Sequence, residues 1–239
     1  MRYEIKGSTM PALEITLDRG ESVFTEVAGM SWMTDGINMA TGTRGGLGKI
    51  IGRAISGESM FLTTFKSTED GARVVFTPDV PGQIIPVELK EGQDIIAQRD
   101  AFMCAEDGVD VKVHFRKKLG VGFFGGEGFV MQRLTGPGMM FAEIGGEVVE
   151  YELQRGEVLK VNPGYVAMHE HTVDYDMGMV GGVRNMIFGG EGVFVATLKG
   201  PGRVWLQTMP LQHLATSIFR YLPEPTIVAP TNEQKADDE

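Results

Sequence analysis

Apolar and polar residues alternate along most of the chain in short runs that turn residues separate. In three of these runs, a glycine followed by Glu or Gln divides two alternating segments, at Gly20, Gly92 and Gly156. The runs are LEITLDRGESV over 13–23, VELKEGQDI over 87–95 and VEYELQRGEVL over 149–159. Alternation with a period of two is typical of a strand with one buried face, so each run predicts a β-hairpin.

A second motif follows each hairpin and contains a Gly-Glu pair ahead of a predicted strand. Its copies are SGESMFLTTF, GGEGFVMQRL and GGEGVFVATL, and their glutamates are Glu58, Glu127 and Glu191. These glutamates are spaced by 69 and 64 residues, and the hairpin glycines are spaced by 72 and 64. Both landmarks therefore indicate three copies of one unit of about 65 to 70 residues.

Short strands with frequent Gly and Pro turns predict an all-β fold of double-sheet units. We expect one compact domain over 1–222, with repeats at about 3–80, 81–145 and 146–209. Closure around a pseudo-threefold axis is favoured over a linear solenoid because large β units without distinct caps do not stack well.

One helix is predicted over 210–222, where PLQHLATSIFRYL places its apolar residues on one stripe between two prolines. The Pro-rich and then acidic segment 223–239 is expected to be disordered.

Composition and charge make some classes of function less compatible with the chain. The chain has 239 residues, 33 of them glycine, and a formal net charge of -10. An acidic surface opposes broad nucleic-acid binding, which depends on Lys and Arg neutralising phosphates. The single Cys104 rules out an internal disulfide and reads as a small buried hydrophobe. No signal peptide or membrane-spanning run is evident, so we expect a cytoplasmic protein.

The sequence resembles a known family, the mitochondrial biogenesis proteins, which are also named for altered inheritance of mitochondria. The resemblance covers roughly residues 3–222 and rests on the FGGEG motifs at 124–128 and 188–192, on SGES at 56–59 and on GRVWLQTMPL. It implies a threefold duplication of a unit similar to the trp RNA-binding attenuation protein (TRAP). It implies little about activity, and RNA binding is not carried over because fold does not fix function.

Two histidines are candidate metal ligands. His169 and His171 would share one side of a strand, with Asp174 and Asp176 nearby, which suits a divalent metal. Repeat alignment instead matches His171 to the Asp-Gly turn at Asp35, which favours an exposed turn residue. Neither Gly120-Val-Gly-Phe-Phe-Gly nor TRGGLGK has the surroundings of a nucleotide site, so we predict no cofactor.

The three repeated glutamates, Glu58, Glu127 and Glu191, are candidate ligand-binding residues. If they point at a common axis, three carboxylates can hold a cation or a proton. In the alternative, which we favour, each accepts backbone N–H groups at its glycine-rich turn.

Cations beside apolar residues precede these glutamates on an otherwise acidic chain. They are Lys49, Arg53, Arg116, Lys117, Lys118 and Arg184. A basic, apolar end suits an anionic membrane surface or a protein partner. In the alternative, the apolar residues are core or oligomer interface and the cations only solvate its edge.

The sequence thus predicts a non-enzymatic scaffold or binding protein that forms homo-oligomers. Two alternatives stay open: a protein bound peripherally to membranes, and a metal- or small-ligand-dependent enzyme with its site between repeats.

Overall fold

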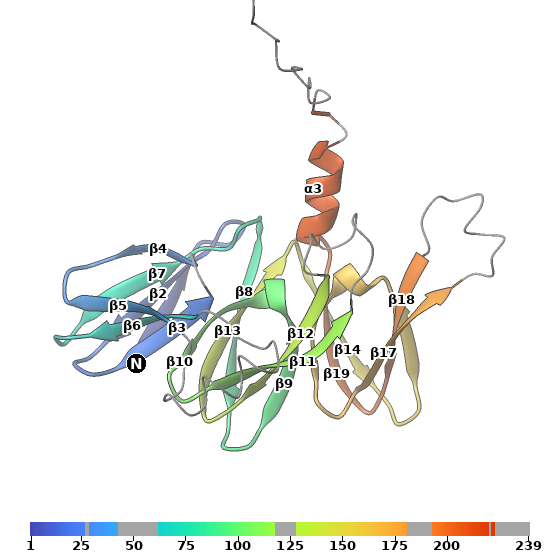
Figure 1. The fold of residues 1–239 in the computed structure, drawn as a ribbon, viewed down its shortest axis with the longest axis horizontal. Coiled ribbons are helices and arrows are strands. Elements are labelled where there is room, and N and C mark those ends of the chain that lie inside the picture. Colours follow the sequence, from blue (N-terminus) through green and yellow to red (C-terminus); the bar gives the residue numbers. More distant parts are fainter. Residues whose placement is uncertain (27–28, 43–61, 118–127, 181–192, 220, 223–239) are drawn as a thin grey trace, which may run out of the picture.

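The computed structural model describes residues 1–26, 29–42, 62–117, 128–180, 193–219 and 221–222. Figure 1 shows β-strands in sheets that follow one another in a row, with one helix standing on the row. The prediction of an all-β fold with one short C-terminal helix is confirmed. The helix α3 (Leu211–Phe219) is shorter than predicted. Its N-terminal boundary is Pro210, whose carbonyl accepts the Leu214 N–H at 3.2 Å.

The first part of the chain, residues 12–76, forms a pair of three-stranded layers that we call unit 1. Its strands are β2 (Ala12–Leu17), β3 (Ser22–Glu26), β4 (Met30–Met33), β5 (Ile37–Gly42), β6 (Leu62–Ser67) and β7 (Ala72–Phe76). One layer has the order β2-β7-β4 and the other has the order β5-β6-β3, and β1 (Arg2–Lys6) pairs with β2.

The same pairing scheme recurs in unit 2, residues 82–145, and in unit 3, residues 148–207. Unit 2 contains β8 (Gly82–Leu89), β9 (Asp94–Gln98), β10 (Phe102–Glu106), β11 (Asp110–Lys117), β12 (Phe129–Thr135) and β13 (Gly138–Gly145). Unit 3 contains β14 (Val148–Leu153), β15 (Val158–Val161), β16 (Val166–Glu170), β17 (Asp174–Val180), β18 (Val193–Lys199) and β19 (Gly202–Gln207). Their layers are β8-β13-β10 and β11-β12-β9, then β14-β19-β16 and β17-β18-β15.

Consecutive units are joined edge to edge by antiparallel pairing. Strand β3 of unit 1 pairs with β10 of unit 2, and β9 of unit 2 pairs with β16 of unit 3. Each junction fuses two three-stranded layers into a six-stranded sheet. Short 3-10 turns, η1 (Arg99–Ala101) and η3 (Pro163–Tyr165), lead into β10 and β16.

Among the strands that the structure describes, the row is open at both ends. Its outer sheets, β1-β2-β7-β4 and β15-β18-β17, end on β4 and on β15. Closure around a pseudo-threefold axis, which the repeats predicted, would bring these two strands together. In the described ranges no ladder joins them, and Figure 1 places unit 1 and unit 3 at opposite ends of the row.

The hairpin turns explain the repeated Gly-Glu/Gln pattern. Gly20, Gly92 and Gly156 all have positive φ, between 72° and 89°, which glycine adopts without strain. The residue after each glycine uses its side chain to accept a backbone N–H three positions earlier. These bonds are Asp18 N to Glu21 Oε2 at 2.8 Å, Lys90 N to Gln93 Oε1 at 3.1 Å, and Gln154 N to Glu157 Oε2 at 2.8 Å.

The core of each unit lies between its two layers, and the junction strands also place side chains in the core of the next unit. In β3, Val23 packs into the core of unit 1, whereas its neighbour Phe24 packs into the core of unit 2. In β9, Ile95 lies in the core of unit 2 and Ile96 in that of unit 3. Because side chains alternate between the faces of a strand, one strand supplies two cores.

Candidate functional sites: a polar cavity and two open sheet edges

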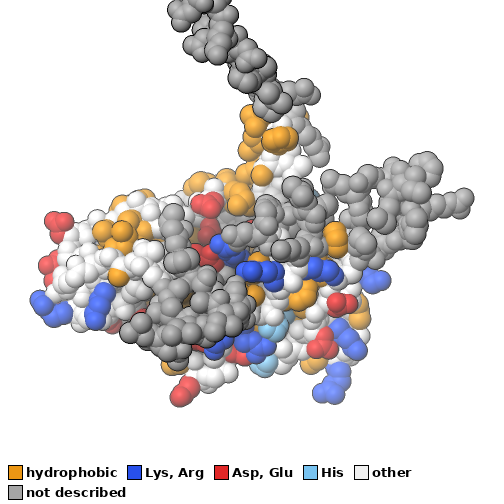
Figure 2. Space-filling model, viewed as in Figure 1, with side chains coloured by type: hydrophobic (Ala, Val, Ile, Leu, Met, Phe, Trp, Pro, Cys, Tyr) orange, Lys and Arg blue, Asp and Glu red, His pale blue; other side chains and the backbone are white. Residues whose placement is uncertain are grey.

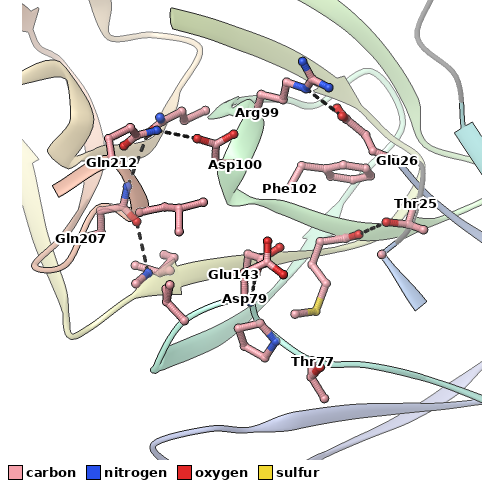
Figure 3. Close-up of a pocket in the computed structure, with 18 of the residues that line it drawn as sticks. Thr25, Glu26, Thr77, Asp79, Arg99, Asp100, Phe102, Glu143, Gln207 and Gln212 are labelled. Atoms are coloured by element: carbon pink, nitrogen blue, oxygen red, sulfur yellow. Dashed lines mark hydrogen bonds and ion pairs between the residues drawn. The ribbon is translucent and has the colours of Figure 1, made fainter. Parts of the chain in front are cut away.

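A cavity of about 600 Å³ lies where unit 1 meets unit 2, at the start of α3. Its walls come from β3, η1, β13, β19 and the first residues of α3, so it exists only when the units and the helix are assembled. Figure 3 shows Asp100, Glu143 and Gln207 around this space, with Phe102 among the apolar side chains that line it. Polar and charged side chains make up about half of the lining, and converging polar groups of this kind fix the orientation of a bound small molecule.

Glu143, on β13, is the most perturbed carboxyl group in the cavity. Burial raises its pKa from 4.5 to about 8, although its Oε2 accepts the Asp79 N–H at 3.2 Å. The negative charges of Asp79 and Asp100 raise the pKa further. At neutral pH the Glu143 carboxyl therefore holds a proton and can donate a hydrogen bond.

Asp100, on η1, lines the cavity and connects it to the helix. Gln212 Nε2 donates a hydrogen bond to Asp100 Oδ2 at 2.6 Å. Desolvation by the surrounding walls raises the Asp100 pKa, and the positive charge of Arg99 opposes this shift. The first turn of α3 is thus held to the cavity by a polar contact.

Glu26, at the end of β3, is tied to unit 2 by two side chains. Arg99 Nε lies 2.8 Å from Glu26 Oε2, and Gln132 Nε2 donates to Glu26 Oε1 at 2.5 Å. Unlike Glu143, this carboxylate faces a guanidinium group. The Glu26–Arg99 ion pair fixes the relative positions of β3 and η1 at the cavity wall.

Gln207, near the end of β19, forms a buried polar link between units 2 and 3. Its Oε1 accepts the Gly145 N–H at 3.1 Å, and its Nε2 donates to the Gly164 carbonyl at 2.8 Å. The Gln98 Oε1 atom lies 3.5 Å from the same Nε2. The network holds β13, η3 and β9 together on one side of the cavity.

The cavity lining is acidic. Four carboxyl groups, of Glu26, Asp79, Asp100 and Glu143, face one guanidinium, that of Arg99. In the part of the chain that the structure describes, the lining contains no histidine, cysteine or lysine. Figure 2 shows acidic side chains gathered on the surface just below the base of α3. The arrangement suits a small ligand that carries positive charge or several hydrogen-bond donors.

Sequence reasoning did not identify this cavity. Its main polar residues come from positions between 25 and 212, and no local spacing links them. The residues that the motifs singled out are outside the described part of the chain: Glu58, Glu127, Glu191, Lys49, Arg53, Lys118 and Arg184. Of the predicted basic face, Arg116 is exposed and the Lys117 ammonium donates to the Met177 carbonyl.

The structure separates the two candidate metal ligands. His169, on β16, is 1% exposed, and its Nδ1 lies 2.8 Å from the Glu170 carbonyl oxygen. Burial lowers its pKa to about 4, so it is neutral. His169 stacks on Tyr175 with a centroid distance of 5.7 Å, whereas His171 lies in the exposed turn after the strand. Among the described residues, no group of three His, Cys, Asp or Glu side chains is placed to hold a metal ion.

The open edges at β4 and β15 form a second candidate site. A bulge interrupts the pairing of β4 between Met30 and Trp32, of β10 between Phe102 and Cys104, and of β16 between Val166 and Met168. This shared bulge makes Trp32, Cys104 and Met168 equivalent. Cys104 and Met168 are 0% exposed at their junctions, whereas Trp32, on an open edge, is 55% exposed. A junction therefore buries a position that the open edge leaves uncovered.

No helix in the described ranges is long and apolar enough to cross a membrane.

Comparison with known proteins identifies the family. The family model "Mitochondrial biogenesis AIM24" matches residues 3–209. An uncharacterised protein of Streptococcus pyogenes serotype M6 is 32% identical over 232 residues, which cover 93% of this chain and 92% of that protein. The crystal structure of a Streptococcus pyogenes protein, 28% identical, has a TM-score of 0.74 and covers 92% of this chain and 99% of its own. The chain therefore belongs to the mitochondrial biogenesis AIM24 family.

Proposed function

We propose that the protein is a non-enzymatic scaffold that associates with further copies of itself. The observation that carries the proposal is a set of exposed apolar side chains at three separate places: the β4 edge, the β15 edge and the segment from α3 to Leu222. Its residues are Trp32, Met33, Val158, Leu211, Ile218, Phe219, Tyr221 and Leu222, each between 38% and 89% exposed. Large apolar side chains left exposed on an unpaired strand edge or along an isolated helix suit a surface that another protein covers.

Helix α3 adds to this surface. None of its residues is buried, and Phe219 is 72% exposed. Figure 1 shows the helix standing away from the sheets, and Figure 2 shows hydrophobic side chains on it and around its base. Most helical stability in proteins comes from packing of an apolar face, so a helix in this position is stabilised when a partner covers it.

We also infer that the three units are copies of one ancestral unit. The identical pairing order, the shared bulge and the three side-chain-capped hairpin turns support this inference. A chain of like units joined by like edges extends naturally beyond its own ends, which is the property that a scaffold needs.

Native mass spectrometry of untagged protein tests the proposal. We expect oligomers whose proportion rises with protein concentration. A spectrum that contains only the monomer across the accessible concentration range would contradict self-association.

The cavity supports a second candidate function, binding of a small organic cation. Its volume suits a small metabolite, and the carboxyl groups of Asp79, Asp100 and Glu143 outnumber the Arg99 guanidinium. Burial raises the pKa of Glu143 to about 8, so its carboxyl is protonated at neutral pH, and a cation bound beside it would favour release of this proton and gain a negatively charged partner.

Titration calorimetry with 1,4-diaminobutane as the probe and neutral 1,4-butanediol as the control tests this candidate. We expect binding of the diamine only, and loss of that binding in the Asp100→Asn/Glu143→Gln variant. Equal heats for diamine and diol, or diamine binding that is unchanged in the variant, would count against it.

A further inference from the structure

We propose that copies of this chain associate head to tail by pairing the β15 edge of one copy with the β4 edge of the next. This inference rests on the proposed self-association and names the surfaces that produce it. The partner is a second copy of the chain because the chain uses the same edge-to-edge contact twice internally, between β3 and β10 and between β9 and β16. In this series, β15 is the equivalent of β3 and β9, and β4 is the equivalent of β10 and β16.

The two internal junctions predict the register of the third. Phe24 pairs with Ala105 at the first junction, and Ile96 pairs with His169 at the second. Their equivalents at the open edges are Lys160 on β15 and Met33 on β4. The second junction also pairs Ala97 with Met168, which predicts that Val161 pairs with Trp32 of the next copy.

The hydrogen-bonding groups of both edges agree with this register. The Glu157 carbonyl accepts the Gly200 N–H at 3.0 Å and therefore points toward β18. The backbone N–H and C=O groups of successive strand residues point to opposite sides, so those of Val158 and Lys160 point away from β18 toward the open side. Directly after β4, the Thr34 N–H donates to the Arg73 carbonyl at 2.9 Å and therefore points toward β7. The backbone N–H and C=O groups of the preceding residue, Met33, then point outward. Met33 and Lys160 thus present free N–H and C=O groups to each other.

Exposure supports the same contact. Trp32 and Met33 are 55% and 38% exposed, whereas their equivalents at the internal junctions, including Met168 and His169, are at most 1% exposed. Val158 is 49% exposed on the opposite edge. The pairing would form one continuous sheet, β1-β2-β7-β4 with β15-β18-β17 of the next copy, on the plan of the internal six-stranded sheets.

Lys160 sets the strength of this contact. It stands where Phe24 and Ile96 place buried apolar side chains in the core of the next unit. A lysine at this position must keep its ammonium in water, which weakens the junction and keeps the association reversible. Contacts of this type are heterologous, so they build rings or filaments rather than a closed twofold dimer.

Disulfide trapping tests the register. Trp32 and Val161 are equivalent to a non-hydrogen-bonded pair, in which Cα atoms are about 4.5 Å apart, within disulfide range. We mix a Trp32→Cys variant with a Val161→Cys variant under mild oxidation and expect a disulfide-linked heterodimer. As a control we mix Met33→Cys with Val161→Cys, where a shift by one residue places the side chains on opposite faces. Equal cross-linking in both mixtures, or none in the first, would overturn the register.

A proline pair tests the strand contact without cysteine. Lys160→Pro removes only an outward-facing N–H and keeps the ladder to β18, and we expect it to weaken association by about tenfold. Glu150→Pro on the β14 edge is the matched control, since Pro86 already occupies the equivalent outward position on β8. We expect the control to associate like the wild type.

The outcomes separate this inference from the function on which it rests. A wild-type chain that stays monomeric contradicts self-association itself. A wild-type oligomer that Lys160→Pro leaves intact, with no Trp32–Val161 cross-link, contradicts only the assignment to β4 and β15. Equal weakening by Lys160→Pro and Glu150→Pro also overturns the assignment.

Discussion

Trp32 and Met168 occupy equivalent positions directly after the same bulge, yet Trp32 is 55% exposed and Met168 is fully buried. The difference is the neighbouring strand, since β9 covers Met168 and no strand of the described chain pairs with the outer side of β4. Trp32 therefore reports whether this edge is covered in solution.

Tryptophan fluorescence is expected to follow self-association. Trp205 is 6% exposed and gives a constant signal, so a blue shift of the emission with rising protein concentration reports burial of Trp32. The Trp32→Phe variant should show no such shift. An emission maximum that is independent of concentration while the protein oligomerises would mean that another surface forms the contact.

Replacing Lys160 by isoleucine is expected to strengthen association. The change restores the apolar residue that Ile96 supplies at the equivalent internal position. Burying one such side chain contributes about 1.5–3 kcal/mol, which corresponds to a Kd at least about tenfold lower. Sedimentation equilibrium measures the Kd, and Lys199→Ile, on the neighbouring strand β18, serves as the control. An unchanged Kd for Lys160→Ile would contradict the proposed register.

Glu143→Gln is expected to remove a pH-dependent loss of stability. The pKa of Glu143 is about 8 in the folded chain, against 4.5 for a glutamate in water, so between these values the native state holds a proton that the unfolded state has released. Wild-type stability therefore falls as the pH rises through this window.

Urea unfolding at two pH values measures the effect. We expect Glu143→Gln to be more stable than the wild type at about pH 8.5, on the order of 2 kcal/mol, and similar to it at about pH 4.5. The same difference at both pH values would show that the carboxyl does not titrate as burial requires.

His169→Phe is expected to reduce the loss of unfolding free energy that the wild-type protein shows as the pH falls. Burial holds the pKa of His169 at about 4, below the usual 6.5, so the unfolded state binds the extra proton first as the pH falls. Wild-type stability should drop between these values by on the order of 2 kcal/mol. Phenylalanine keeps the stacking on Tyr175 but cannot titrate. If both proteins lose the same stability over this window, His169 is not the titrating group.

The sequence was sufficient for local structure. Gly20, Gly92 and Gly156 marked the hairpins because a positive φ favours glycine whatever surrounds the turn. Pro210 marked the start of α3 because a proline carbonyl can begin a helix while its ring cannot continue one. These features depend on a few neighbouring residues, which a pattern in the chain records.

The sequence did not reveal what depends on assembly. In the sequence, Glu143 resembles other strand glutamates; its pKa is raised by desolvation in the folded chain and by the charges of Asp79 and Asp100, which lie far from it in the sequence. The arrangement of the units in a row likewise depends on the antiparallel pairing of β3 with β10. This is a tertiary contact that no local sequence pattern predicts. The repeated Gly-Glu pair, on which the prediction of ligand-binding glutamates rested, lies outside the described residues.

Sedimentation velocity of the wild-type chain over a dilution series, from about 100 μM to about 1 μM, shows directly whether copies of the chain associate. We expect species larger than the monomer at high concentration, which dissociate reversibly on dilution because Lys160 weakens the contact between β15 and β4. A single monomer boundary at every concentration would mean that the chain does not self-associate.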